Sequence, residues 1–133
     1  MIDFSTIEGE LATRIGALGL GFKTTEAGRI REVIPIASMP ALDIAAQGHQ
    51  TTQSASRDYT VPMICVIRRK GFDRTANATE FKELVEAVCA NLEGYSGTSF
   101  DVVRDIASQL GEEQSGDGSL VRSVVITFKC LAH

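Results

Sequence analysis

Histidine is the side chain best suited to general acid–base chemistry near neutral pH, and this sequence has two histidines, His49 and His133. Neither has a second metal-ligating residue at helix or hairpin spacing. We therefore interpret both as solvated surface residues. A Ser-His-Asp or Cys-His pair stays open, because such residues meet in space rather than in sequence.

Three acidic residues, Glu112, Glu113 and Asp117, lie in a glycine-rich stretch, 111–118. Paired carboxylates of this kind can bind Ca²⁺, but their spacing is not that of an EF-hand loop. The pattern favours a solvated, acidic loop at the tip of a hairpin.

The basic residues cluster once, at Arg68, Arg69 and Lys70, with Arg74 nearby. Such a cluster can contact phosphate or an acidic partner, or it can simply keep the end of a strand soluble. Because the net charge of the whole chain is −4, any use of this cluster is local.

The three cysteines, Cys65, Cys89 and Cys130, are odd in number, far apart, and each within an apolar segment. We interpret them as buried free thiols of a reducing compartment. A disulfide or a redox thiol is the alternative, but the sequence lacks the C-x-x-C or Cys/His context that would support it.

A polar tract, 47–56, separates the two halves of the chain and contains no aromatic residue, no β-branched aliphatic residue and no acid. Connections in compact domains are usually about 4–6 residues long. We expect the tract to be a flexible arm that orders when it docks to a partner. The residues expected to make this contact are His49, Gln50, Thr51, Thr52 and Gln53.

The length of 133 residues predicts one domain, 1–133. Hydrophobic residues make up 44% and tryptophan is absent, which indicates an aliphatic core. The negative net charge disfavours general binding to nucleic acid. The sequence shows neither a signal peptide nor an apolar run of the roughly 18 residues that a membrane span needs, so we expect a cytoplasmic protein.

Two segments have the periodicity of amphipathic helices. The first, Phe4–Leu18, places Ile7, Leu11, Ile15 and Leu18 on one face. Its start is predicted at the capping box 5–8, with Asp3 as the alternative cap. The second helix, 80–92, has an apolar stripe, a capping box at 77–80 and a C-terminal Gly94.

The remaining segments alternate as strands do. We expect a hairpin between 20–24 and 29–34, an extended segment 36–39, a short strand or a helical turn at 41–45, and a main strand 57–70. The pattern of 100–110 fits a strand or a helix; we favour a strand, which would form a long hairpin with 120–132. Pro62 lacks an N–H and predicts an edge or a bulge in the main strand. The predicted fold class is α+β, a mostly antiparallel β-sheet packed against two amphipathic helices.

This order of elements resembles the tail terminator (tail-completion or neck) proteins of long-tailed bacteriophages and prophage-like particles. The likeness is carried by Leu11 and Leu18 of the first helix, the prolines at 35 and 40, the alternating strand 59–67, the helix 80–92, and the closing strand 121–128.

The resemblance implies a structural virion protein without enzymatic activity, assembled in the cytoplasm and carried in the tail or neck. Such proteins usually form a hexameric ring that ends tail-tube growth and joins the tail to the head-side connector. Their partners are further copies of themselves, the tail-tube protein and the connector, while packaged DNA passes through the pore without sequence-specific binding. We accordingly expect no cofactor, no metal and no membrane partner, and we expect the basic cluster 68–70 to meet the acidic stretch 112–117 between subunits or rings.

Two other classes of function stay open. In an enzyme or a small ligand-binding domain, Asp43, His49, Asp58 and Tyr59 could converge on a pocket beside the polar tract. In a cytoplasmic adaptor, the chain would act as a twofold dimer. The oligomeric state separates this dimer from a ring.

Overall fold

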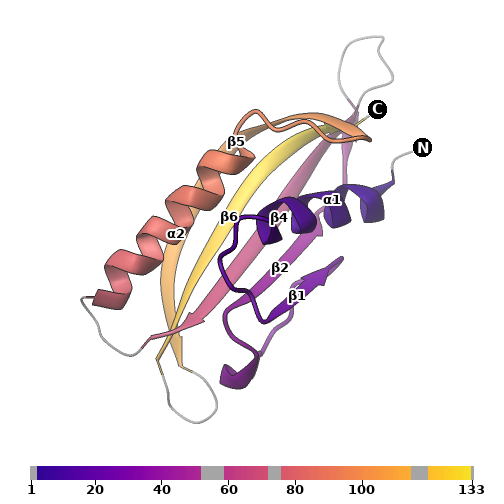
Figure 1. Ribbon diagram of the computed structural model, residues 1–133. Helices are drawn as coiled ribbons and strands as arrows, with labels where there is room; N and C mark the ends of the chain where they lie inside the picture. Colours follow the sequence, from indigo (N-terminus) through magenta and orange to yellow (C-terminus); the bar gives the residue numbers. More distant parts are fainter. Residues whose placement is uncertain (1–2, 52–58, 72–75, 115–119, 133) are drawn as a thin grey trace.

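The computed structural model describes residues 3–51, 59–71, 76–114 and 120–132. It has the predicted α+β class: two helices pack against a curled, mostly antiparallel sheet of six strands (Figure 1). In chain order the elements are α1 (Phe4–Gly16), β1 (Thr24–Ala27), the 3₁₀ turn η1 (Ile36–Ser38), β2 (Ala41–Ala46), β3 (Gln50–Thr51), β4 (Tyr59–Lys70), α2 (Ala76–Leu92), β5 (Phe100–Gln114) and β6 (Leu120–Ala132).

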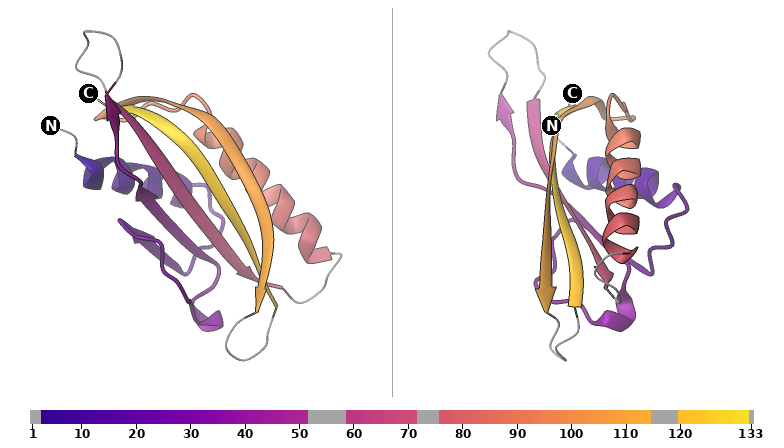
Figure 2. Two further views of the ribbon diagram at one scale, coloured as in Figure 1. Left: turned by 180° about the vertical axis from the view of Figure 1, so that it is seen from behind. Right: turned by 90° about the vertical axis from the view of Figure 1, so that its left-hand side faces the viewer.

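The strands lie in the order β1-β2-β4-β6-β5, and β3 pairs with the beginning of β4. The pair β1–β2 is parallel and all the others are antiparallel. Both helices lie on the same face of the sheet (Figure 2). The outer strands of the described sheet are therefore β1 and β5.

The hydrophobic core lies between this face and the helices. Alternate residues of β4 and β6 point into it, as the sequence periodicity predicts. The largest fully buried side chains include Phe100, Phe128, Ile7, Leu11, Ile15, Leu42, Ile44, Met63, Ile67, Leu92 and Ile126. The core is thus mainly aliphatic.

The start of α1 differs from the predicted capping box. Asp3 is the N-cap, and its carboxylate accepts hydrogen bonds from the amide and the hydroxyl of Thr6 at 3.1 and 2.6 Å. The hydrogen bond from the Thr6 hydroxyl, followed by the one from its amide, lowers the pKa of Asp3. Glu8, the other residue of the predicted box, is instead buried and accepts a hydrogen bond from the Ala46 amide at 2.8 Å. Glu8 therefore ties α1 to β2.

Helix α2 begins at Ala76, before the predicted start. The predicted capping box at 77–80 is therefore wrong, because Asn77 lies inside the helix. The end of the helix agrees with the sequence: Gly94 follows it with φ +74°, a left-handed conformation that glycine adopts without strain.

The predicted hairpin of 20–24 with 29–34 is wrong. β1 pairs instead with β2, in parallel, and residues 28–40 form the connection between them. The connection is held to β2 instead of folding back as a hairpin: the Asp43 carboxylate accepts hydrogen bonds from the Arg31 amide at 3.2 Å and from its guanidinium at 2.7 Å. The segment 36–39, expected to be extended, contains the 3₁₀ turn Ile36–Ser38.

Pro62 lies in the central strand β4, where its pairing with β6 is continuous. Its missing N–H falls on the other side, between the segments that pair with β2 and with β3. Between the pairs Ala46–Met63 and Gln50–Thr60, three residues of the β2–β3 segment lie opposite two residues of β4. Pro62 sits at this irregularity, where its carbonyl accepts a hydrogen bond from the Gln47 amide at 2.8 Å. The predicted bulge is confirmed, and the edge position is not.

The last hairpin is longer than predicted. Strand β5 continues through the glycine-rich stretch to Gln114, so residues 111–114 are not part of a loop. The register of β5 against β6 shifts twice, between Asp101 and Ala107. From Ala107 to Gln114 the pairing is regular.

Gly97 gives a first prediction about stability. A Cβ at this position would strike the Glu10 carboxylate, a flexible side chain that can move, and would lie 2.5 and 2.7 Å from the ring of Phe100, which is fully buried. Gly97→Ala should lower the free energy of unfolding by about 1–3 kcal/mol, because the core ring has no free space to move into. Gly9→Ala, where a Cβ meets nothing within 4 Å, is the comparison variant, and it should keep or raise the free energy of unfolding because alanine is favoured inside helix α1. Equal unfolding midpoints in urea for the two variants would contradict this reading.

Candidate interaction site

The residues expected to contact partners fall into two groups at opposite ends of β4 (Figure 1). Arg68, Arg69 and Lys70 close the strand at one end, beside Glu112 and Glu113 of β5. We call this the charged end. His49 and the short strand β3 lie at the other end, which we call the tract end. The chain thus presents two chemically different surfaces along one strand.

Asp43 is the centre of the charged end and is fully buried. Its carboxylate contacts the Arg31 guanidinium at 2.6–2.7 Å and the Arg68 guanidinium at 3.0 Å. Arg68 also donates a hydrogen bond to the Arg31 carbonyl at 2.9 Å. Two cations therefore share one buried carboxylate, and each holds the other in place.

Arg68 also lies near a second carboxylate, that of Glu113. The Nε atom of Arg68 lies 3.6 Å from the carboxylate of Glu113, which is about half-exposed. Arg68 was expected at the surface, but it is 6% exposed. The prediction was wrong about its placement because Asp43 on the neighbouring strand draws the guanidinium over the sheet. Arg68 and Glu113 meet inside one chain, and their contact contributes to the fold.

Two further ion pairs extend the charged end toward α2. Arg69 contacts Glu80 at 3.0 Å and Arg122 contacts Glu112 at 3.2 Å. Lys70, half-buried, also has an interaction partner. Asp117, which the sequence placed in the same acidic group, lies outside the described residues.

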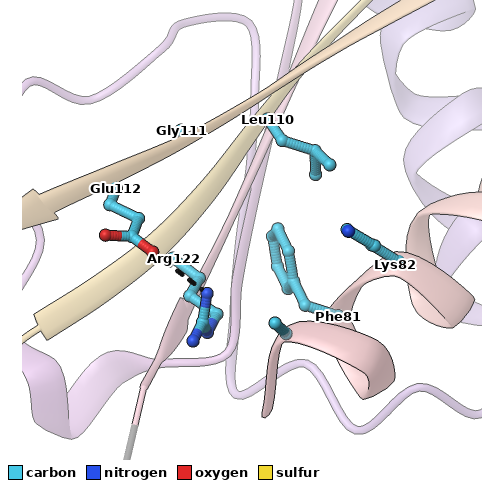
Figure 3. A pocket seen from close by; sticks show the side chains of 7 residues that line it. Phe81, Lys82, Leu110, Gly111, Glu112 and Arg122 are labelled. Carbon is cyan, nitrogen blue, oxygen red and sulfur yellow. Dashed lines mark hydrogen bonds and ion pairs between the residues drawn. The ribbon is translucent and has the colours of Figure 1, made fainter. Parts of the chain in front are cut away.

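A pocket of about 330 Å³ lies next to these pairs, between the start of α2 and the strands β5 and β6 (Figure 3). Phe81 and Leu110 supply apolar walls, while Lys82, Glu112 and Arg122 supply charges. Glu112 pairs with Arg122, and the lining carries two cationic side chains and one anionic side chain. The pocket is therefore a shallow amphipathic hollow at the surface of the charged end.

At the tract end, three aromatic rings lie together. The His49 ring lies 5.4 Å from the Tyr59 ring, edge to face, and 6.2 Å from the Phe4 ring. His49 is exposed, as expected. Gln50 and Thr51 form β3, so this part of the tract is a strand and not a free arm. Thr52 and Gln53 lie outside the described residues.

The pocket predicted for an enzyme is wrong as far as the structure describes its residues, because Asp43 lies far from His49 and Tyr59. Asp43 pairs with Val66 in the ladder, which is seven residues from Tyr59, or about 23 Å along the strand. Asp43 is already engaged by two arginines, while His49 and Tyr59 lie at the other end. Asp58 lies outside the described residues.

The cysteines are free thiols. Cys65 and Cys130 are buried in the core, whereas Cys89 on α2 is half-buried and lines a groove beside β5. Burial raises the pKa of all three thiols, that of Cys130 to about 12. Buried thiols in this state react slowly.

Thiol labelling should follow this burial. In the native protein at pH 8, we expect one thiol, Cys89, to react with a thiol-specific reagent well before the other two. Its rate should keep rising as the pH passes 9, because a raised pKa leaves most of the thiol protonated below that point. Unfolding in urea should expose all three. Early labelling of Cys65 or Cys130 under native conditions, read by peptide mass spectrometry, would contradict the placement.

The sequence predicted the residues of the charged end but not the buried ion pairs at its centre. Asp43 and Arg31 organise the charged end, and Arg31 was not singled out. The signal was present: a lone carboxylate stands in the apolar strand Ala41–Ala46, and a buried carboxylate needs a paired cation.

Within the described residues, no three His, Cys, Asp or Glu side chains gather as they would around a metal ion. Neither of the helices, as far as they are described, is long and apolar enough to cross a bilayer.

Comparison with known proteins found similarity among solved structures. No family model matches the sequence, and no curated protein matches it. Among solved structures, a chain in a structure entitled "Virion of native gene transfer agent (GTA) particle" aligns with a TM-score of 0.45 and 8% sequence identity. The alignment covers 92% of this chain and 84% of that chain.

Proposed function

We propose that this protein is a structural subunit of a phage-like particle and has no enzymatic activity. In this proposal it forms a ring at the head-proximal end of the tail, ends tail-tube growth and joins the tail to the head-side connector. Its partners are further copies of the chain, the tail-tube protein and the connector protein. DNA passes through the ring without sequence-specific contacts.

The observation that carries the proposal is the placement of different surfaces on one rigid subunit. The charged end and the tract end lie at opposite ends of β4, and the sheet between them has an outer strand on each side. A subunit held between two different rings needs two such end surfaces, and ring closure needs two complementary lateral surfaces. The element order that resembles tail terminators supports the same reading.

The ion pairing of the charged end also fits a ring held between two partners. Asp43, Arg31 and Arg68 form an internal network that Glu113 borders, while Glu112 and Glu80 pair with Arg122 and Arg69. Side chains already held by ion pairs lose less freedom when a partner binds. The ends of a tail ring have to match their neighbours in this way.

The test is the oligomeric state of the purified chain. Native mass spectrometry should give one closed oligomer, with six copies expected, and negative-stain images should show a ring. Added to polymerising tail-tube protein, the ring should cap the tubes and limit their length. A stable twofold dimer that leaves tube length unchanged would favour the adaptor function instead.

A further inference from the structure

The outer strand β5 has a segment, residues 107–111, without the features that usually protect a sheet edge; we call it the bare segment. Its first half is irregular and charged: the register shifts twice, and Asp101, Arg104 and Asp105 are exposed. Bulges and charges are the usual protection of a sheet edge against pairing with other chains. The next residues, 107–111, are regular, uncharged and all exposed, and 47% of Leu110 is exposed. This part of the edge lacks the usual protection.

The backbone groups on this edge can be assigned from the ladder. The Leu120 carbonyl accepts a hydrogen bond from the Gly71 amide, so even-numbered residues of β6 point their N–H and C=O groups toward β4. Odd-numbered residues of β6 therefore bond to β5, where Ser123 pairs with Gly111. It follows that Ser108 and Leu110 direct their backbone groups outward.

The same reasoning applies to β1, the opposite edge. The Gly28 amide donates to the Ile44 carbonyl, so even-numbered residues at this edge point toward β2. Thr25 and Ala27 therefore direct their N–H and C=O groups outward, and both are exposed. Each edge thus offers two residues with outward donors and acceptors.

The two edges lie at the same height of the sheet. One row of directly paired residues crosses it through Thr24, Ala41, Arg68, Ser123 and Gly111, and another through Ala27, Ile44, Cys65, Ile126 and Ser108. The four residues of β1 are therefore level with residues 108–111, which belong to the bare segment of β5. Polarity agrees as well: β1 runs parallel to β2 and β6, whereas β5 runs against them.

We propose that the bare edge of β5 binds β1 of a second copy of this chain, as an antiparallel extension of the sheet. Ser108 then pairs with Ala27 of the second copy, and Leu110 with its Thr25, both through outward backbone groups. The contact joins two different edges, so it is heterologous and can close into a ring. The inference rests on the proposed function and assigns the lateral contact of that ring.

Side-chain charge supports this partner. With Leu110 opposite Thr25, Glu112 comes close to Lys23, which directly precedes β1 and donates its amide to the Pro40 carbonyl at 2.8 Å. Lys23 is exposed, and the Glu112 side chain is 58% exposed. The lysine and the carboxylate have opposite charges, so they attract each other at this end of the pair. A twofold β5–β5 contact would offer no Lys23.

Disulfide trapping tests the register. Gln109→Cys and Glu26→Cys fall on directly opposed residues of the proposed pair, within the Cα separation that a disulfide spans. On oxidation, a chain carrying both changes in a Cys89→Ala background should give a ladder of linked oligomers. A mixture of the two single variants should give linked dimers. Gln109→Cys with Val33→Cys, which is on no strand and 80% exposed, should give none.

Proline substitution tests the edge independently. Ser108→Pro removes an outward N–H and leaves the bonds to β6 intact, so the fold should persist by circular dichroism. Association should weaken about tenfold, from the lost donor. Ser108→Thr, which keeps the N–H, should assemble as the unmodified chain does.

The outcomes separate the two proposals. Rings that persist in Ser108→Pro, with no trapped ladder, would overturn the edge pairing and leave the ring function standing. Disulfide dimers of Gln109→Cys alone would show a twofold β5 contact and would also overturn the pairing. A chain that is monomeric under all conditions would overturn both the ring function and the edge pairing.

Discussion

Asp43→Asn is expected to lower the free energy of unfolding by about 3–5 kcal/mol, because it leaves two arginines without their shared buried carboxylate. Asp43 is fully buried, and the side chains of Arg68 and Arg31 are 8% and 19% exposed. Water reaches these guanidinium groups poorly, so it cannot replace the lost charge. Urea unfolding followed by circular dichroism would measure the loss.

The matched control is Asp105→Asn. Asp105 is also a carboxylate in a strand with a cationic neighbour, Lys129 at 3.8 Å, but its side chain is 63% exposed. A surface pair of this kind contributes about 0–1 kcal/mol. Asparagine also tolerates the positive φ of this position, +57°. Equal losses in the two variants would show that Asp43 is not the centre of the charged end.

A loss of similar size, about 3–5 kcal/mol, is expected for Phe100→Ala. Phe100 is fully buried and pairs with Ala132 at the tract end of the sheet. Its ring meets the Tyr95 ring edge to face, with centroids 5.8 Å apart. Removing it leaves a cavity between β5 and the turn after α2.

Phe100→Leu should recover a large part of this loss, since it refills much of the volume but not the aromatic contact. In the same leucine background, Gly97→Ala should cost less than it does in the unmodified chain, because the ring that its Cβ would strike is gone. Strictly additive losses for the two positions would contradict the packing described for Phe100.

The elements that the sequence predicted well are those with a long, clean period. The apolar stripes of both helices, the alternation of 59–70 and that of 120–132 all correspond to observed elements. Here local pattern and tertiary burial demand the same conformation. Pro62 also gave a sound local prediction, although the strand is central.

The parallel strand β1 could not be predicted in this way. Thr24–Ala27 carries no apolar alternation, and the connection that follows it is held by hydrogen bonds of Arg31 to Asp43 of β2. Likewise, the glycine-rich stretch 111–114 is typical of a turn, but pairing with β6 extends it as a strand. Contacts distant in sequence outweighed local preference in both places.

The charged end shows the same limit. The residue types were visible in the sequence, but their exposure was not. Arg68 looks like any basic residue at the end of a strand until the register places it beside Asp43. Once the sheet order is known, the burial of that arginine follows from the charge on its neighbour.

The aromatic residues of the tract end have a practical consequence for spectroscopy. The chain has no tryptophan and two tyrosines. Tyr59 lies against His49, and Tyr95 lies under the Arg14 guanidinium and beside Phe100, so both phenols sit toward one end of the sheet. Binding of a partner at the tract end should therefore change the intrinsic tyrosine fluorescence. Binding at the charged end should leave this fluorescence unchanged, so a dye or an added tryptophan would be needed there as a reporter.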